Sequence, residues 1–234
     1  MTSKLTQLYL SKWNLLSSSL KALKVNSLYI FKPTNPLLLT VNNDYLDADI
    51  KIMIFGQETN SWFNKFNSVE ELQNAYKNFF LEKNYKKRGG QFWNGTNQLV
   101  SLISNEFPNK KVSFIWNNII KIGKYNKKNK PPEYIQEVET KYFNVVSKEI
   151  EILNPDIIVF FSGPYYDNIL KSKLSRCVFK KIQSNIPCRQ LAKINYDNFS
   201  NCYRTYHPNY LYRSKKLNSF FHIIVKDLKS NATF

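Results

Sequence analysis

Short, continuous apolar runs are the main pattern along this chain. Four of them, at residues 51–55, 112–116, 157–161 and 202–206, have the length of strands, and the last is the most mixed in character. A run without alternation is typical of a strand that is buried on both faces, as in a parallel sheet. The pattern therefore predicts a central sheet of four parallel strands.

Segments with helical spacing of apolar residues lie before, between and after these strands. They cover about residues 4–24, 69–83, 92–103, 135–153, 165–170 and 217–228. Ser68 and Ser214 are the expected N-caps of the second and the last of these helices, and Asn154 and Pro155 end the fourth. Alternating strands and helices predict an α/β fold, a three-layer α/β/α sandwich formed by a single domain over residues 1–234, with a core at about 45–228.

Composition and charge restrict the class of partner. The chain of 234 residues carries 34 Lys and Arg against 17 Asp and Glu, a net charge of +17, which favours a nucleic-acid partner. Its apolar runs fall short of the roughly 18 residues that a membrane span needs. The three cysteines have no metal-ligand spacing, so we expect a cytoplasmic protein without metal, iron–sulfur cluster or other cofactor.

Polar groups suited to chemistry follow the first and fourth strands. Residues 56–60 read Gly-Gln-Glu-Thr-Asn, and residues 207–209 read His-Pro-Asn. In open α/β sheets, sites form just beyond the carboxyl ends of strands. A carboxylate such as Glu58 suits the stabilisation of a cationic sugar, and a donor such as His207 suits the stabilisation of a departing anionic base. Together with the net charge of +17, these groups indicate an enzyme that acts on a polyanion, and their chemistry agrees with hydrolysis of an N-glycosidic bond.

The same segments resemble the motifs of the uracil-DNA glycosylase superfamily. Residues 56–60 resemble its G-Q-D-P-Y motif, residues 207–209 its H-P-S motif, and residues 118–121 its Asn-bearing segment that reads the base. Their order and their positions at strand ends agree with that family over about residues 45–228. The resemblance implies a uracil-DNA glycosylase-like fold and a monofunctional DNA glycosylase. Such an enzyme flips out a uracil or modified pyrimidine and hydrolyses its glycosidic bond.

The resemblance also assigns roles to individual residues. It makes Glu58 and His207 catalytic, and it gives base-binding roles to Gln57, Asn60, Asn118, Trp62 and Phe92, with Phe63 and Trp93 as further candidates for the aromatic platform. Asn60 stands where the family has a Tyr that blocks C5-substituted bases, so the pocket is expected to accept a 5-substituted pyrimidine. Glu58 replaces the usual Asp, Thr59 replaces a proline, and Asn209 replaces a serine that touches phosphate.

Basic loops and the segment after His207 are the expected DNA contacts. The residues assigned to this class are Lys87, Arg88, Lys121, Lys124, Lys127, Lys128, Asn209, Leu211 and Arg213. Leu211 is the expected wedge, because an apolar side chain can fill the gap that a flipped base leaves in the stack. The DNA is single- or double-stranded, and the protein is expected to act as a monomer.

Other functions agree with the same residues. Taken singly, Glu58 and Asn118 suit caps or turns, and His207 suits a structural histidine. The chain can also be a defence glycosylase that excises modified bases from phage DNA, an inactive nucleic-acid-binding member of the fold, or an unrelated α/β enzyme that uses Glu58 and His207 on a nucleotide. The formation of abasic sites in oligonucleotides that carry different bases separates these alternatives.

Overall fold

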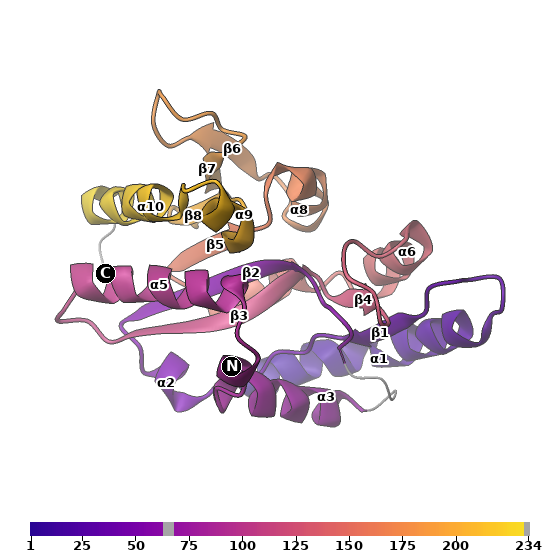
Figure 1. Ribbon diagram of the computed structural model, residues 1–234. Helices are drawn as coiled ribbons and strands as arrows, with labels where there is room; N and C mark the ends of the chain where they lie inside the picture. The colour runs from indigo at the N-terminus through magenta and orange to yellow at the C-terminus, as the bar shows by residue number, and fades with distance from the viewer. Residues whose placement is uncertain (63–67, 232–234) are drawn as a thin grey trace. The chain divides into compact units, whose positions relative to one another are not determined.

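The computed structural model describes residues 1–62 and 68–231 (Figure 1). The chain divides into two compact units. The first unit comprises Met1–Val41, Gln57–Lys83 and Asn118–Leu153, and the second comprises Asn42–Gly56, Asn84–Asn117 and Asn154–Phe234. A single domain over residues 1–234 stays a prediction.

A mostly parallel sheet forms the centre of the second unit. Within the described residues it has six strands in the order β3-β2-β5-β8-β7-β6. These are β2 (Ile50–Glu58), β3 (Val112–Ile120), β5 (Ile157–Phe161), β6 (Val178–Lys181), β7 (Leu191–Asn195) and β8 (Cys202–Thr205). Strand β5 is parallel to β2 and β8, whereas β7 is antiparallel to β8 and β6. Residues 57–58 of β2 and 118–120 of β3 belong to the first unit.

This sheet confirms the α/β class and corrects the strand count. The four predicted strands are β2, β3, β5 and β8, and they are neighbours in the sheet. Strands β6 and β7 were missed. Strand β6 lies at the sheet edge, where Lys180 and Lys181 are exposed. Charged residues on an edge strand hinder pairing with other chains, and they also remove the apolar run that predicts a buried strand.

Helices flank this sheet on both faces. One face packs against α5 (Gln91–Glu106), α9 (Pro208–Arg213) and α10 (Leu217–Asn231), through a core that includes Ile54, Val159 and Tyr203 from the strands. On the other face, the buried Arg204 of β8 forms an ion pair with Asp167 of α8 (Asp167–Lys173), which follows the short helix η2 (Pro164–Tyr166). The short helices α2 (Asn43–Leu46) and α4 (Tyr85–Arg88) complete the unit.

The first unit is built around a long N-terminal helix. Helix α1 (Thr2–Val25) confirms the predicted helix at 4–24 and contacts α3 (Val69–Tyr76), α6 (Glu133–Tyr142), α7 (Val146–Leu153) and β1 (Pro33–Pro36). Helix α3 continues into the π-helical segment η1 (Lys77–Leu81). Strand β1 pairs with β4 (Ile122–Lys124) in an antiparallel ribbon. No helix in residues 1–62 or 68–231 has the length and apolar character to cross a membrane.

The observed helix ends agree with the predicted ones at some positions and differ at others. Ser68 is the N-cap of α3, as predicted, and it also forms a capping box with Glu71. The predicted helix at 135–153 is instead two helices that break at residues 143–145, a break that the continuous apolar spacing conceals because Phe143 and Val145 are themselves buried. Ser214 is the C-cap of α9 rather than the N-cap of the last helix.

Candidate functional site

In the first unit, the residue after Glu58 is held by the end of β3. Thr59 is buried, and both its backbone N–H and its hydroxyl donate to the carbonyl oxygen of Ile120, at 3.2 and 3.1 Å. Proline has neither an N–H nor a hydroxyl, so the proline of the G-Q-D-P-Y motif would make neither bond. Thr59 therefore anchors the half-buried Gln57 and Glu58 through bonds that a proline at its position could not make.

Asn118 joins the same anchor. Its side chain is buried, and its Nδ2 donates to the Thr59 hydroxyl oxygen at 3.3 Å. The carbonyl of Thr59 in turn lies where any side chain at position 123 would begin, since a Cβ on Gly123 would lie 1.6 Å from that oxygen. Glycine is thus required at position 123, and the structure brings Asn118 together with the residue next to Glu58.

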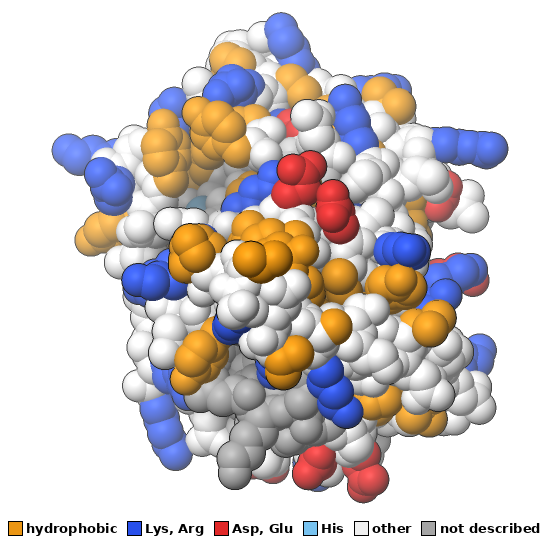
Figure 2. Space-filling model, turned by 90° about the vertical axis from the view of Figure 1, so that its right-hand side faces the viewer, with side chains coloured by type: hydrophobic (Ala, Val, Ile, Leu, Met, Phe, Trp, Pro, Cys, Tyr) orange, Lys and Arg blue, Asp and Glu red, His pale blue; other side chains and the backbone are white. Residues whose placement is uncertain are grey.

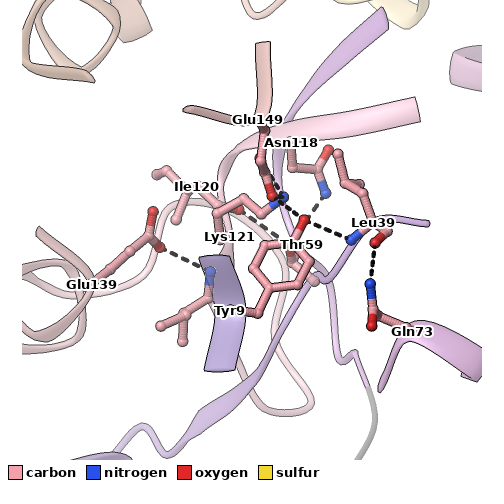
Figure 3. A network of polar contacts seen from close by, with 10 residues as sticks. Tyr9, Leu39, Thr59, Gln73, Asn118, Ile120, Lys121, Glu139 and Glu149 are labelled. Atoms are coloured by element: carbon pink, nitrogen blue, oxygen red, sulfur yellow. Dashed lines mark hydrogen bonds and ion pairs between the residues drawn. The ribbon is translucent and has the colours of Figure 1, made fainter. Parts of the chain in front are cut away.

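A buried ion pair stabilises the chain just after β3. The Lys121 ammonium lies 2.8 and 3.0 Å from the two carboxylate oxygens of Glu149, and both side chains are fully buried. The Tyr9 hydroxyl donates to Glu149 at 2.6 Å and accepts from the backbone N–H of Leu39 at 3.0 Å (Figure 3). Burial, reinforced by the charge of Glu149, raises the pKa of Tyr9, so its phenol keeps the proton that it donates.

Further hydrogen bonds extend this network through the first unit. Gln73 of α3 donates to the Leu39 carbonyl at 2.8 Å and accepts from Thr6 of α1 at 2.9 Å. Glu139 of α6 accepts from the Ile122 backbone at 2.9 Å. The network therefore joins α1, α3, α6 and α7 to the segment that follows Asn118 (Figure 3).

The prediction that Lys121 contacts DNA is wrong. A fully buried ammonium that is paired with Glu149 is not available to a phosphate. Lys121 stands between Ile120 and Ile122, and that apolar context was the signal that this lysine is internal. Sequence reasoning also missed Tyr9, Thr59 and Glu149 as residues that position the candidate site.

In the second unit, His207 is the N-cap of α9. Its Nδ1 accepts from the backbone N–H of Asn209 at 3.2 Å. Burial lowers the pKa of the imidazole, so the ring is neutral at pH 7. In a neutral ring whose Nδ1 accepts, the proton is assigned to Nε2. His207 thus presents an uncharged N–H donor.

Phe92 is the aromatic candidate that the second unit places beside His207. The two ring centroids are 5.8 Å apart with planes at 31°. Helix α5 can approach α9 this closely because Gly95 has no side chain. A Cβ at that position would lie 2.6 Å from the Cβ of Pro208. Trp93 packs instead against Tyr85 and Trp116.

The structure gives less support to the other candidates for base contacts. Trp62 is buried in the first unit, edge-on to Phe79 with centroids 5.5 Å apart, and its carbonyl accepts from the Asn35 backbone. That environment is typical of a core residue. Asn60 is exposed, and Phe63 lies outside the described residues.

The remaining expected DNA contacts fall into two groups. Lys87, Arg88, Lys127, Lys128, Asn209 and Arg213 are exposed, and Lys124 is half-buried with its ammonium 5.0 Å from the centre of the Phe31 ring. Figure 2 shows basic side chains spread over much of one face, with few acidic ones. Leu211, however, is fully buried in the core beneath α9, so the prediction that it is a wedge is wrong.

Comparison with known families agrees with the motifs. The family model described as the Uracil DNA glycosylase superfamily matches residues 44–229. The matched range contains β2, β3, β5 and β8 and the segments that bear Glu58, Asn118 and His207. No curated protein matches the sequence.

The Lys121–Glu149 pair gives a testable prediction about stability. Lys121→Met leaves the Glu149 carboxylate buried without its cation and should lower the free energy of unfolding by about 3–5 kcal/mol. Lys121→Met combined with Glu149→Leu should be less destabilised than the sum of the single variants, because neither charge is then orphaned. Urea denaturation measures each difference.

A matched control lies on the same helix. Lys148 and Glu151 of α7 form an exposed pair, so Lys148→Met should change stability by less than about 1 kcal/mol. Equal losses for Lys121→Met and Lys148→Met would contradict a special role for the buried pair.

Proposed function

The chain belongs to the uracil-DNA glycosylase superfamily, and we propose that it is a monofunctional glycosylase that excises a uracil or modified pyrimidine from DNA. Family membership supports a DNA glycosylase type of activity and DNA as the partner. The observation that carries the finer proposal is the neutral His207, whose Nε2–H is a donor beside the ring of Phe92.

The proposed reaction breaks the bond between C1′ of the sugar and the ring nitrogen of the base. The bonding electrons leave with the base, which becomes an anion, while the sugar acquires oxocarbenium character. Water adds to C1′, and the proton that it loses ends on the base anion, so the products are the free base and an abasic site. Hydrolysis needs two kinds of electrostatic help, one for the cationic sugar and one for the anionic base.

Glu58 and His207 supply these two kinds of help. The Glu58 carboxylate stabilises the sugar cation and orients the water. The Nε2–H of His207 donates to the base oxygen on which negative charge develops. Because the ring is neutral, it stabilises the anion as a hydrogen-bond donor and not as a cation.

Base selection is assigned to the residues around the anchor formed by Thr59. Asn118 carries both N–H donors and an acceptor, which suits a pyrimidine edge, and the Gln57 segment contributes further contacts. Phe92 provides the stacking surface for the flipped base. The exposed Asn60, which is smaller than tyrosine, leaves room for a substituent at C5.

The biological setting belongs to the proposal as well. Excision of C5-modified bases suits either repair or defence against phage DNA that carries such bases. The free thiols of Cys177, Cys188 and Cys202 agree with a cytoplasmic protein. We propose that it acts as a monomer.

The first test concerns the carboxylate. Glu58→Gln should lower the rate of abasic-site formation by orders of magnitude and leave DNA affinity nearly unchanged, because the amide lacks the charge that stabilises the cation. Excision is measured on oligonucleotides that carry uracil, hydroxymethyluracil, hypoxanthine or glucosylated hydroxymethylcytosine. Glu70→Gln, at an exposed position of α3, is the control and should excise at the wild-type rate. Full activity of Glu58→Gln would remove Glu58 from the mechanism.

The second test concerns the protonation state of His207. His207→Ala should lower kcat by about 10²–10³-fold, the scale of one lost oxyanion donor, whereas His207→Gln keeps an uncharged N–H and should retain part of that activity. Since burial lowers the pKa of His207, wild-type kcat should stay level as pH falls through 6.5 and decrease only below it. The contribution of His207 to folding stability is present above pH 6.5 and is lost as pH falls toward the lowered pKa. Rising kcat on acidification would indicate a cationic histidine instead.

The third test concerns the size of the base. Asn60→Tyr should suppress excision of hydroxymethyluracil through steric overlap with the C5 substituent, and it should spare excision of uracil. Asn60→Ala is the control and should accept both bases. The idea fails if the wild-type protein cleaves uracil efficiently and never a C5-substituted base.

A further inference from the structure

Two exposed tyrosines of α9 lie on opposite sides of the helix. Tyr210 is 52% exposed and Tyr212 is 61% exposed, while Leu211 between them is fully buried. Residues two positions apart on a helix do not face each other, so the two rings belong to different surfaces. They provide a matched pair, because the same residue type occupies both sides of one short helix.

Among the contacts of the described residues, only Tyr210 of this pair packs against another aromatic ring. The Tyr210 ring lies 4.5 Å from that of Tyr206, with an angle of 41° between their planes. Tyr206 lies against Gly163, where an added Cβ would be 3.2 Å from the Tyr206 ring. The Gly163 N–H donates to the Thr205 carbonyl at 2.9 Å, so both tyrosines are supported by the ends of β5 and β8.

A third tyrosine and a cation belong to the same ends of these strands. Tyr165, two residues after Gly163, is 81% exposed, and the Arg189 guanidinium lies 5.1 Å from its ring centre. The backbone that carries Arg189 is fixed, because Arg204 donates to the carbonyls of Cys188 and Arg189, both at 2.9 Å. Tyr165, Tyr206, Tyr210 and Arg189 are called the tyrosine row below.

The charge around the tyrosine row favours a nucleic-acid strand as its occupant. Lys216 donates to Gln190, the neighbour of Arg189, at 2.7 Å, and Arg213 is exposed on α9. Asp167, the acidic group on α8, is neutralised by its ion pair with Arg204. Exposed rings that are supported from behind and accompanied by cations suit bases and phosphates, respectively.

Stacking on such rings requires bases whose faces are open. In a duplex each base already stacks on its neighbours, whereas an unpaired strand presents its base faces to a protein. We propose that the tyrosine row stacks on the unpaired bases next to the excised nucleotide, so that this protein prefers single-stranded to duplex DNA. The inference rests on the proposed glycosylase function and names its substrate class. The position of His207 between Tyr206 and Tyr210 in the sequence places the row next to the proposed chemistry.

Binding to DNA without a target base tests the row. The probe is a fluorescein-labelled 20-nucleotide strand of ordinary bases, alone or annealed to its complement, and fluorescence anisotropy gives Kd at fixed salt. Tyr210→Ala should weaken binding to the single strand about tenfold, within the range measured for one base–aromatic stack, and should weaken duplex binding less. Tyr210→Phe keeps the ring and should bind as wild type does. Tyr212→Ala removes an equally exposed ring on the other side and should also bind as wild type does.

A second variant tests the row independently of Tyr210, and a binding measurement separates the role of the row from catalysis. Tyr165→Ala should reproduce the preferential loss of single-strand affinity. If Tyr210→Ala and Tyr212→Ala weaken binding equally, or if single strand and duplex are affected alike, the tyrosine row does not select single strands. If the Tyr210 effect is present while no abasic site forms on any modified oligonucleotide, the row stands and the proposed excision fails.

Discussion

The buried ion pair between Lys121 and Glu149 is the constraint on which the first unit depends. Removing two charges from water is costly, and the cost is offset only when geometry and additional hydrogen bonds satisfy both groups. Tyr9 supplies one of these bonds to Glu149, and the Leu39 backbone in turn supplies one to Tyr9. The pair is therefore stable only if α1, α7 and the segment before β2 occupy one relative arrangement within this unit.

That constraint determines the local geometry of the candidate base-reading residue. Asn118 lies three positions before Lys121, and Ile120 between them accepts both hydrogen bonds from Thr59. Fixing Lys121 thus fixes the carbonyl that orients Thr59, and Thr59 in turn accepts from Asn118. The network acts on chemistry through backbone position, because a candidate catalytic carboxylate directly precedes Thr59.

The second unit prepares His207 by a different means. No buried charge pair with His207 is needed, since burial alone disfavours the imidazolium and the Asn209 N–H occupies Nδ1. The close contact at Gly95 brings α5 against Pro208, and Phe92 comes with it. Glycine in a helix interior is less favourable than alanine by about 1 kcal/mol, and the close packing at Gly95 offsets this cost.

The sequence predicted four of the six described strands of the sheet, because continuous apolar runs are local signals. It ended β2 and β3 too early, since these strands continue through the polar residues Glu58 and Asn118. It failed where a residue's environment depends on distant partners. Lys121 was assigned to the surface by its type, although Glu149, 28 positions later, keeps it inside. Leu211 was assigned to DNA by analogy, although the apolar stripe of α10 and the strands of the sheet bury it. The helix break at 143–145 gave no signal in the apolar pattern, because Phe143 and Val145 are themselves buried.

Both wrong assignments share a physical cause that indicates how such sequences are better interpreted. A lysine flanked by isoleucines at the end of a buried strand has no exposed position available, so its presence requires a carboxylate elsewhere in the chain. A leucine between two tyrosines on a short helix has one inward position available, and the leucine takes it because burying its side chain is worth about 1.5–3 kcal/mol. The tyrosines, which retain a polar hydroxyl, are left at the surface. The flanking residues, rather than the residue itself, therefore indicate which side chain is presented to a partner.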